Sequence, residues 1–192
     1  ARVESVEIKK DFVDVITSSN GNTVTYSSRC VVVAGGYGSG KLLGPQYGAT
    51  GDFVMGIQSE LVLDGSKEAS VFFGKQYSPG FFGWLVPFNK DRAYLGLMAR
   101  DNINSHYQNL FDHLVSLGKV RPSGDIKATI RGIPLYPAKR TYTHRCLLVG
   151  SAAGQVKPVT GGGIYFGLIC ADIAAEILLQ KLQNDDLSNH SL

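Results

Sequence analysis

Apolar and polar residues alternate along the first 27 residues of the chain. The runs Val3–Lys9 and Phe12–Thr17 place apolar side chains at about every second position, which is the period of a half-buried strand. Ser18–Asn22 supplies residues typical of a turn, and Thr23–Ser27 returns to a β-branched pattern. The pattern predicts a small antiparallel meander.

Two later runs are apolar without alternation. Arg29–Ala34 contains Cys-Val-Val-Val-Ala and is followed by two glycines, and Cys146–Gly150 reads Cys-Leu-Leu-Val-Gly. Short continuous apolar runs are typical of strands that are covered on both faces of an α/β sheet. They therefore predict two buried strands of one α/β domain.

Between these runs, from about Thr50 to Ala138, the pattern changes. Four strand candidates, separated by Gly, Pro, Asn and Asp turns, are Phe53–Leu63, Ser70–Tyr77, Gly83–Val86 and Ala93–Ala99. Asn104–Leu117 is predicted as a helix, because its apolar residues recur at three- and four-residue spacing and a glycine follows it. The middle therefore predicts a mostly antiparallel sheet that carries a helix.

A second helix is predicted from about Gly161 to Leu182, after the second buried run. The expected fold class is α/β plus antiparallel β, in which residues 1–50 and 141–192 form part of a Rossmann-like domain and residues 51–140 form an inserted α+β domain. The first residues already alternate as a strand and no Met precedes them, so we expect the chain to be part of a longer protein.

Composition and charge narrow the classes of function. With 44% hydrophobic residues, 18% charged residues and a net charge of +3, the chain is neither disordered nor marked by the basic stripe of a nucleic-acid binder. The three cysteines lie far apart without a CxxC pattern, so we expect no disulfide framework, no metal site and a reducing compartment. Asp172 and Glu176 interrupt the longest apolar stretch, so no membrane span is expected.

The 23 glycines exceed the usual share and gather after the two buried runs. One cluster is Gly35–Lys41, and the other extends from Gly150 to Gly163. Backbone N–H groups at a helix start attract negative charge, and the absence of side chains lets a flat ligand approach the backbone. The second cluster thus predicts a site for an anion or a polarised ring, and the alternative of a flexible loop with a tight helix–strand contact stays open.

The first cluster nearly matches a phosphate-binding Gly-x-x-x-x-Gly-Lys loop. Leu42 follows the lysine where a hydroxyl residue would hold Mg²⁺, and Pro45 would cut short a following helix. Nucleotide hydrolysis is therefore disfavoured.

The run Gly150–Tyr165 resembles the second FAD motif of the geranylgeranyl reductase family of flavoproteins, in which Gly-Asp-Ala-Ala-Gly precedes Pro-x-Thr-Gly-Gly-Gly-Ile. Val31–Gly36 is similar to the strand and Ala-Gly turn that approach FAD in that family, and Pro79–Pro87 resembles its Tyr-x-Trp-x-Phe-Pro segment. The resemblance implies an FAD-dependent oxidoreductase that reduces C=C bonds of a prenyl or other apolar substrate by hydride transfer from reduced flavin.

The resemblance also implies which residues would meet cofactor and substrate. FAD would contact Ala34, Gly35, Gly36, Gly150, Ser151, Ala152, Ala153, Gly154, Pro158, Thr160, Gly161, Gly162 and Gly163. Phe82, Trp84 and Pro87 would line a pocket for the prenyl chain. Pro158 would pack near the isoalloxazine, and backbone N–H groups of Gly161–Gly163 would face its N1/O2 edge. No residue stands out as a catalytic acid or base.

The chain departs from the family pattern in two places. Ser151 stands where the family has an Asp that hydrogen-bonds the ribityl chain, so the bond it could make is not charge-assisted. The N-terminal Gly-x-Gly-x-x-Gly that holds the FAD pyrophosphate is absent from this sequence. We therefore expect the missing N-terminal part of the same protein as a partner, and poor FAD binding by this chain alone.

Two alternative functions stay open. One is a flavin monooxygenase or halogenase of the same architecture, and the other is a non-catalytic flavoprotein remnant or interaction domain. The electron donor is left open between NAD(P)H and a protein carrier. We expect a cytoplasmic protein with no nucleic-acid partner, and contact with a membrane surface is left open.

Overall fold

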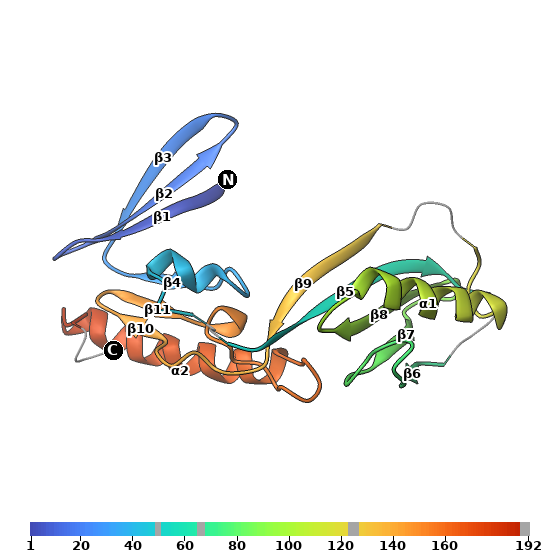
Figure 1. Cartoon of the computed structure of the whole chain (residues 1–192). Helices are drawn as coiled ribbons and strands as arrows, with labels where there is room; N and C mark the ends of the chain where they lie inside the picture. The colour runs from blue at the N-terminus through green and yellow to red at the C-terminus, as the bar shows by residue number, and fades with distance from the viewer. Residues whose placement is uncertain (49–50, 65–67, 123–126, 189–192) are drawn as a thin grey trace. The chain divides into compact units, whose positions relative to one another are not determined.

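The computed structural model describes residues 1–48, 51–64, 68–122 and 127–188 (Figure 1). Contacts divide the chain into two units, one made of residues 1–52 and 134–192 and the other of residues 53–133. We call them the first and the second unit. Each has its own apolar core, so each is described by itself.

The first unit begins with a three-stranded meander of β1 (Arg2–Ile8), β2 (Val13–Ser19) and β3 (Asn22–Ser28). β2 is the central strand and pairs antiparallel with both neighbours. The turn between β2 and β3 has positive φ at Asn20 and Gly21, two residue types that tolerate this conformation. The predicted meander is confirmed.

A second small sheet in this unit has the order β10 (Tyr142–Thr143), β11 (Cys146–Leu148), β4 (Val31–Val33). The two apolar runs pair in parallel as predicted. Burial is confirmed for β11, whose three residues are all buried. It is wrong for β4, because Val32 is 44% exposed. Among the described residues β4 pairs with β11 alone, and this leaves one of its edges open.

The core of the first unit joins the two sheets. Its buried residues are Val13, Val33, Leu43, Tyr47, Cys146, Leu148, Ala152 and Ala153. The short 3₁₀ turn Ser39–Leu43 contributes to this core and ends at Gly44, directly before Pro45. The backbones of Gly40 and Gly48 approach closely there because neither residue has a side chain. A Cβ added at Gly40 would be 2.3 Å from the Gly48 Cα.

Helix α2 (Ile164–Gln183) starts three residues later than the sequence predicts, because Gly161 and Gly162 belong to the preceding loop. Within the described chain, none of its residues is buried. Its large exposed apolar residues are Ile164, Tyr165, Phe166, Leu168, Ile169, Ile173 and Leu179. A helix that is apolar on most sides is normally covered by other elements.

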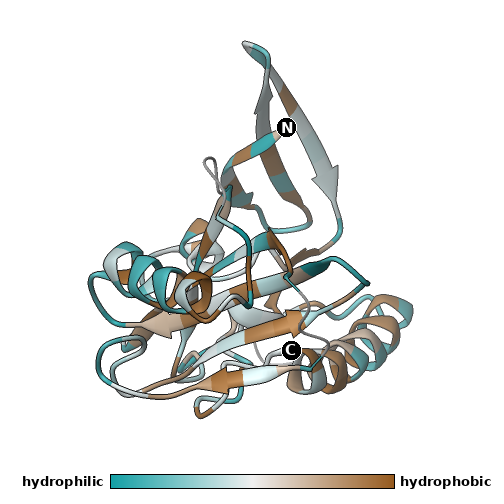
Figure 2. Cartoon of the chain, turned by 90° about the vertical axis from the view of Figure 1, so that its right-hand side faces the viewer, coloured by the Kyte–Doolittle hydropathy of each residue, from teal (hydrophilic) through white to brown (hydrophobic). Residues whose placement is uncertain are grey.

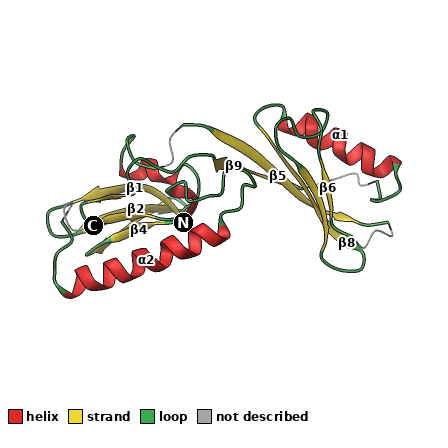
Figure 3. Cartoon of the chain, turned by 90° about the horizontal axis from the view of Figure 1, so that it is seen from below, coloured by secondary structure: helices red, strands yellow, loops and turns green. Residues whose placement is uncertain are grey.

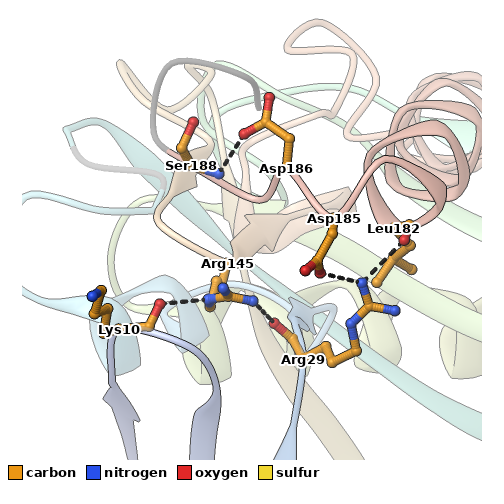
Figure 4. A network of polar contacts seen from close by, with 7 residues as sticks. All are labelled: Lys10, Arg29, Arg145, Leu182, Asp185, Asp186 and Ser188. Atoms are coloured by element: carbon orange, nitrogen blue, oxygen red, sulfur yellow. Dashed lines mark hydrogen bonds and ion pairs between the residues drawn. The ribbon is translucent and has the colours of Figure 1, made fainter.

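Arginine side chains fix the C-terminal end of α2 (Figure 4). Arg29 donates from Nη2 to the Leu182 carbonyl at 3.0 Å and to Asp185 Oδ1 at 2.6 Å. Arg145 donates to the carbonyl oxygens of Lys10, at 2.9 Å, and of Arg29, at 3.1 Å. These bonds tie the end of α2 to the β1–β2 turn and to the start of β4.

The second unit is built on one five-stranded sheet. Its order is β6 (Ser70–Phe72), β7 (Gly83–Pro87), β8 (Arg92–Ala99), β5 (Phe53–Val62), β9 (Ala128–Pro134). The pairs β6–β7, β7–β8 and β8–β5 are antiparallel. The expected antiparallel sheet is confirmed for these four strands.

Helix α1 (Ile103–Ser116) covers one face of this sheet (Figure 3). Its buried residues Tyr107, Leu110, Phe111 and Leu114 meet alternate residues of β5, β7 and β8. Coloured by hydropathy, the helices carry both polar and apolar residues (Figure 2), and in α1 the apolar ones are those that the sheet buries.

Two strands differ from the sequence prediction. The sequence pattern does not predict β9, because Gly132 and Pro134 weaken the strand signal; an edge position tolerates both residues. β6 ends at Phe72, five residues earlier than predicted, because the chain turns at Gly74, where φ is +130° and the Ser78 N–H bonds the Gly74 carbonyl.

Candidate functional site

The ends of β4 and β11 bring the two glycine clusters together. The strands run in parallel with Leu148 opposite Val33, and the Val149 N–H donates to the Val33 carbonyl at 3.1 Å. Their carboxyl ends therefore meet at one edge of the sheet, which is where open α/β sheets bind ligands. The residues that follow are Ala34, Gly35 and Gly36 on one strand and Gly150 on the other.

Gly36 and Gly150 have positive φ, at 85° and 63°, and face open space. A Cβ added at either position would meet nothing within 4 Å. Gly35 differs, since its added Cβ would lie 3.0 Å from the Ser39 Cβ. The open backbone at Gly36 and Gly150 is the kind of surface on which a flat ligand can lie.

The turn after Gly150 is anchored in the core of the first unit. Ala152 and Ala153 have no exposed surface, and the Ala138 N–H donates to the Ala153 carbonyl at 2.8 Å. Gly154 has a φ of 70°, and an added Cβ would lie 2.3 Å from the Tyr136 carbonyl oxygen. These three predicted site residues hold the turn in place: the methyl groups of Ala152 and Ala153 are buried, and the Gly154 backbone packs against Tyr136.

Gln155 has a role that sequence reasoning missed. Its Oε1 accepts a hydrogen bond of 2.7 Å from the Gly150 N–H, and its own N–H donates to the Gly150 carbonyl at 3.0 Å. The first N–H of the turn is therefore satisfied by the protein. The only signal in the sequence is an amide side chain five residues after the glycine, which has no specific meaning by itself.

Ser151 lies beside the start of helix α2. A Cβ added at Gly163 would be 4.0 Å from the Ser151 Oγ, so the hydroxyl and the N-cap of the helix are near neighbours. The Ser151 side chain is half-buried. A group bound at the helix start would thus have this hydroxyl within reach.

The loop before α2 is closed by its own hydrogen bonds. The Gly161 N–H donates to the Lys157 carbonyl at 2.9 Å, and the Lys157 N–H donates to the Gly162 carbonyl at 3.0 Å. The Gly162 N–H faces Thr160 Oγ1 at 3.4 Å. Two of the three glycine N–H groups expected to face the flavin therefore donate within the loop.

The N–H groups that stay available are one step further along the chain. The first backbone bond into α2 runs from the Gly167 N–H to the Gly163 carbonyl at 2.8 Å. Ile164, Tyr165 and Phe166 therefore have no acceptor inside the helix for their N–H groups. Together with the helix dipole, these groups favour negative charge at the N-terminus of α2.

Two hollows flank this helix start. Pro158 lines an apolar pocket of about 290 Å³, whose wall also includes Pro137, Val156, Phe166 and Cys170. Lys157, Thr160 and Gly162 line a neighbouring hollow of about 350 Å³ with Tyr165 and Phe166. Ala34 and Gly35, at the end of β4, line a separate apolar groove of about 350 Å³ along β4 and the meander.

The residues present fit the ring and ribityl side of a flavin. Open backbone at Gly36 and Gly150, the Ser151 hydroxyl and the N–H groups of α2 lie at one edge of the first unit. This sequence does not contain the Gly-x-Gly-x-x-Gly turn that binds the pyrophosphate of FAD. These residues correspond to one half of the site that the resemblance leads us to expect for FAD.

The predicted substrate residues lie in the second unit and divide between its faces. Trp84 lies on the sheet face opposite α1, and the ring centroids of Phe82 and Trp84 are 5.9 Å apart. Pro87 is three residues further along β7, so alternation places it on the α1 face. The structure thus groups Phe82 with Trp84 and separates Pro87 from them.

In the described part of the chain, no three His, Cys, Asp or Glu side chains gather where a metal ion could bind, and no helix is long and apolar enough to cross a membrane. Cys30, Cys146 and Cys170 are free. Burial raises the pKa of the Cys146 thiol to about 11, with a smaller contribution from Cys30, so this thiol is protonated at neutral pH.

No protein-family model matches the chain. Among curated proteins, digeranylgeranylglycerophospholipid reductase 2 of Methanopyrus kandleri is 34% identical over 141 residues, which cover 68% of this chain and 36% of that protein. An uncharacterized protein of Methanocaldococcus jannaschii is 29% identical over 192 residues, which cover 97% of this chain and 49% of the relative. The chain thus spans half or less of the length of these relatives.

Solved structures share the fold. A geranylgeranyl bacteriochlorophyll reductase-like protein from Thermoplasma acidophilum matches 98% of this chain and 50% of its own, with a TM-score of 0.82 and 18% identity. The flavin-dependent halogenase CmlS matches 98% of this chain and 37% of its own, with a TM-score of 0.72 and 19% identity. On sequence, at 31–35% identity to four of these reductases, the chain is a homologue of the digeranylgeranylglycerophospholipid reductases.

Proposed function

We propose that this chain is part of a flavin-dependent reductase that saturates C=C bonds of a prenyl-type lipid. The proposal rests on the homology to digeranylgeranylglycerophospholipid reductases together with one feature of the structure. That feature is the meeting of the open backbone after β4 and β11 with the N-terminus of α2. A bound reduced flavin would supply the hydride, and a proton would complete the addition.

The residues of this chain would bind and orient the cofactor. The N–H groups of Ile164, Tyr165 and Phe166 would stabilise negative charge on the ring edge. The Ser151 hydroxyl would donate a hydrogen bond to the ribityl chain, and Pro158 would pack against the ring from its apolar pocket. Phe82 and Trp84 would supply an apolar wall for the substrate, which excludes water from the alkene.

The decisive experiment uses the full-length protein that contains this chain. It is reduced and incubated with a geranylgeranyl lipid, with NAD(P)H or a reduced ferredoxin-type carrier as electron donor, and the product is followed by mass spectrometry. We expect a mass gain of one H₂ for each double bond reduced. Absence of a saturated product with both donors contradicts the proposal.

Ser151 allows a sharper test of the cofactor site. Ser151→Asp adds a carboxylate at the helix N-terminus and can accept a charge-assisted bond from a ribityl hydroxyl, so FAD affinity of the full-length protein should rise about tenfold. Ser151→Asn is the matched control, because it adds a similar volume without charge. Equal affinities for Ser151→Asp and wild type, measured by flavin fluorescence, argue against a ribityl chain at this position.

Likeness to flavin-dependent halogenases gives the second candidate function. A monooxygenase or halogenase consumes O₂, whereas a reductase does not. Oxygen uptake that depends on substrate and yields a hydroxylated or halogenated product would favour this candidate. If the full-length protein binds no FAD, that result would instead favour a non-catalytic remnant.

We further propose that the remaining part of the same protein covers α2 and the open edge of β4. The support is the exposed apolar surface of α2, with Leu168 67% and Leu179 61% exposed, and the greater length of the relatives. Leu168→Lys should weaken association with that part when the two are co-expressed. The same substitution at Tyr26, which is 58% exposed on β3, is the control.

A cytoplasmic location, with the lipid taken from a membrane surface, fits the proposed function. Cell fractionation tests this location.

A further inference from the structure

Trp84 lies across the open face of the five-stranded sheet in an unusual setting. One cross-strand row of this face contains Val71 of β6, Trp84 of β7, Gly96 of β8 and Gln58 of β5, as the strand registers show. These four residues stand side by side in neighbouring strands and point away from α1. Trp84 is therefore next to the only residue of the row without a side chain.

Gly96 leaves the space that the indole occupies. A Cβ added at Gly96 would lie 2.4 Å from Trp84 Cζ2 and 2.5 Å from Trp84 Cε2. The same Cβ would be 2.7 Å from the carbonyl oxygen of Ile57. Any side chain at Gly96 would thus push the indole away from the backbone of β8.

Gln58 holds the far end of the indole. The Trp84 Nε1–H donates to Gln58 Oε1 at 3.2 Å, so the ring spans the glycine and reaches the next strand. On the other side of Trp84, Val71 is 55% exposed, and Phe82 and Phe73 continue the apolar surface with ring centroids 6.3 Å apart. The outer face of the indole and these side chains form one elongated apolar surface.

We propose that Gln58 and Gly96 are positioning residues for Trp84. Gly96 lets the indole lie flat on the sheet, and Gln58 fixes its rotation, so that the ring presents its broad face to an extended apolar chain. This inference rests on the proposed function, because the chain in question is the prenyl group of the substrate. A purely structural role, in which the indole shields the glycine, would change stability without changing lipid binding.

The test uses the intrinsic fluorescence of the 192-residue chain, in which Trp84 is the single tryptophan. The positioning is measured first without lipid, as acrylamide quenching of Trp84. Gln58→Leu removes the acceptor, and Gly96→Ala removes the space, so both should raise quenching above wild type. Gln58→Glu keeps an acceptor oxygen and should restore the wild-type value.

The second measurement titrates geranylgeraniol and follows the Trp84 emission. We expect Gln58→Leu to weaken binding about three- to tenfold, because the indole is no longer held in place and must be ordered when the lipid binds. The far-UV circular dichroism spectrum checks that the variant remains folded. Glu60→Gln is the matched control, because Glu60 is two residues along β5 on the same face and pairs with Arg92 instead of Trp84. It should change neither quenching nor binding.

The two measurements separate the inference from the proposed function. Quenching and lipid affinity that are the same in Gln58→Leu and wild type overturn the positioning role, even if the lipid binds well. In another outcome, the wild-type chain does not bind geranylgeraniol, but Gln58→Leu still raises the quenching of Trp84. That outcome supports the positioning role and contradicts the prenyl-binding wall. Since Gly96→Ala could fail to fold, the Gln58 variants alone decide the outcome.

Discussion

Gly154 and Gly150 have nearly the same φ, 70° and 63°, for different physical reasons. Gly154 is packed so closely against the Tyr136 carbonyl that a Cβ would be 2.3 Å from it, whereas a Cβ at Gly150 would meet nothing within 4 Å. We expect Gly154→Ala to lower the free energy of unfolding by about 2–4 kcal/mol, from backbone strain plus overpacking.

Gly150→Ala is the matched control for this prediction, because it carries the strain of positive φ without the clash. It should cost about 1–2 kcal/mol. Urea unfolding measures both. Equal losses for the two variants would show that the contact with Tyr136 does not restrict the turn.

Cys146 should make the first unit less stable at alkaline pH. Burial raises its pKa from 9.0 to about 11, so the folded chain keeps this proton when the unfolded chain has lost it. The contribution of the buried neutral thiol is therefore complete below about pH 9 and is lost as pH rises through about 11, by at most about 3 kcal/mol.

Cys146→Ala isolates this effect from other groups that titrate in the same range. The difference in the free energy of unfolding between wild type and variant should shrink between pH 9 and 11. A constant difference over this range would mean that the thiol titrates normally.

At the scale of elements, the two helices show how far an apolar pattern determines packing. The three- and four-residue spacing in α1 predicts its buried side, and the structure confirms Tyr107, Leu110, Phe111 and Leu114 as that side. The pattern of α2 is apolar on most of its circumference, so it does not say which side packs. In the described chain none of α2 is buried.

Two leucines of the α1 region provide a matched test. Leu114 has no exposed surface, and Leu117 at the helix end is 54% exposed. Leu114→Ala should cost about 2–5 kcal/mol because it leaves a cavity in the core. Leu117→Ala should cost less than about 1 kcal/mol. Thermal unfolding followed by circular dichroism compares them, and similar losses would contradict the packing of α1 on the sheet.

At the scale of the whole molecule, two separate cores predict two unfolding events. The core on α1 lies within residues 53–133, and the core around β4 and β11 lies within the first unit. Calorimetry of the 192-residue chain should therefore resolve two transitions. Leu114→Ala should lower one melting temperature and Leu148→Ala the other. A single transition shifted by both variants would show that the units unfold together.

The sequence by itself determined the elements whose signal is local. Alternation predicts the meander, and strand-like runs between turn residues predict four of the five strands of the second unit, because both signals depend on a few neighbouring residues. The motif from Gly150 to Tyr165 also points to the prenyl reductases, because it is one continuous run of residues, and the homology bears this out.

Only the tertiary structure decided which groups meet and which are already used. Gln155 satisfies the Gly150 N–H, Gly161 donates to Lys157, and Trp84 reaches Gln58 across Gly96. Strand β9 lies at the edge of its sheet, where Gly132 and Pro134 are tolerated. Each of these facts depends on strand register and on the path of a loop in space, and neither is encoded in a local pattern of residues.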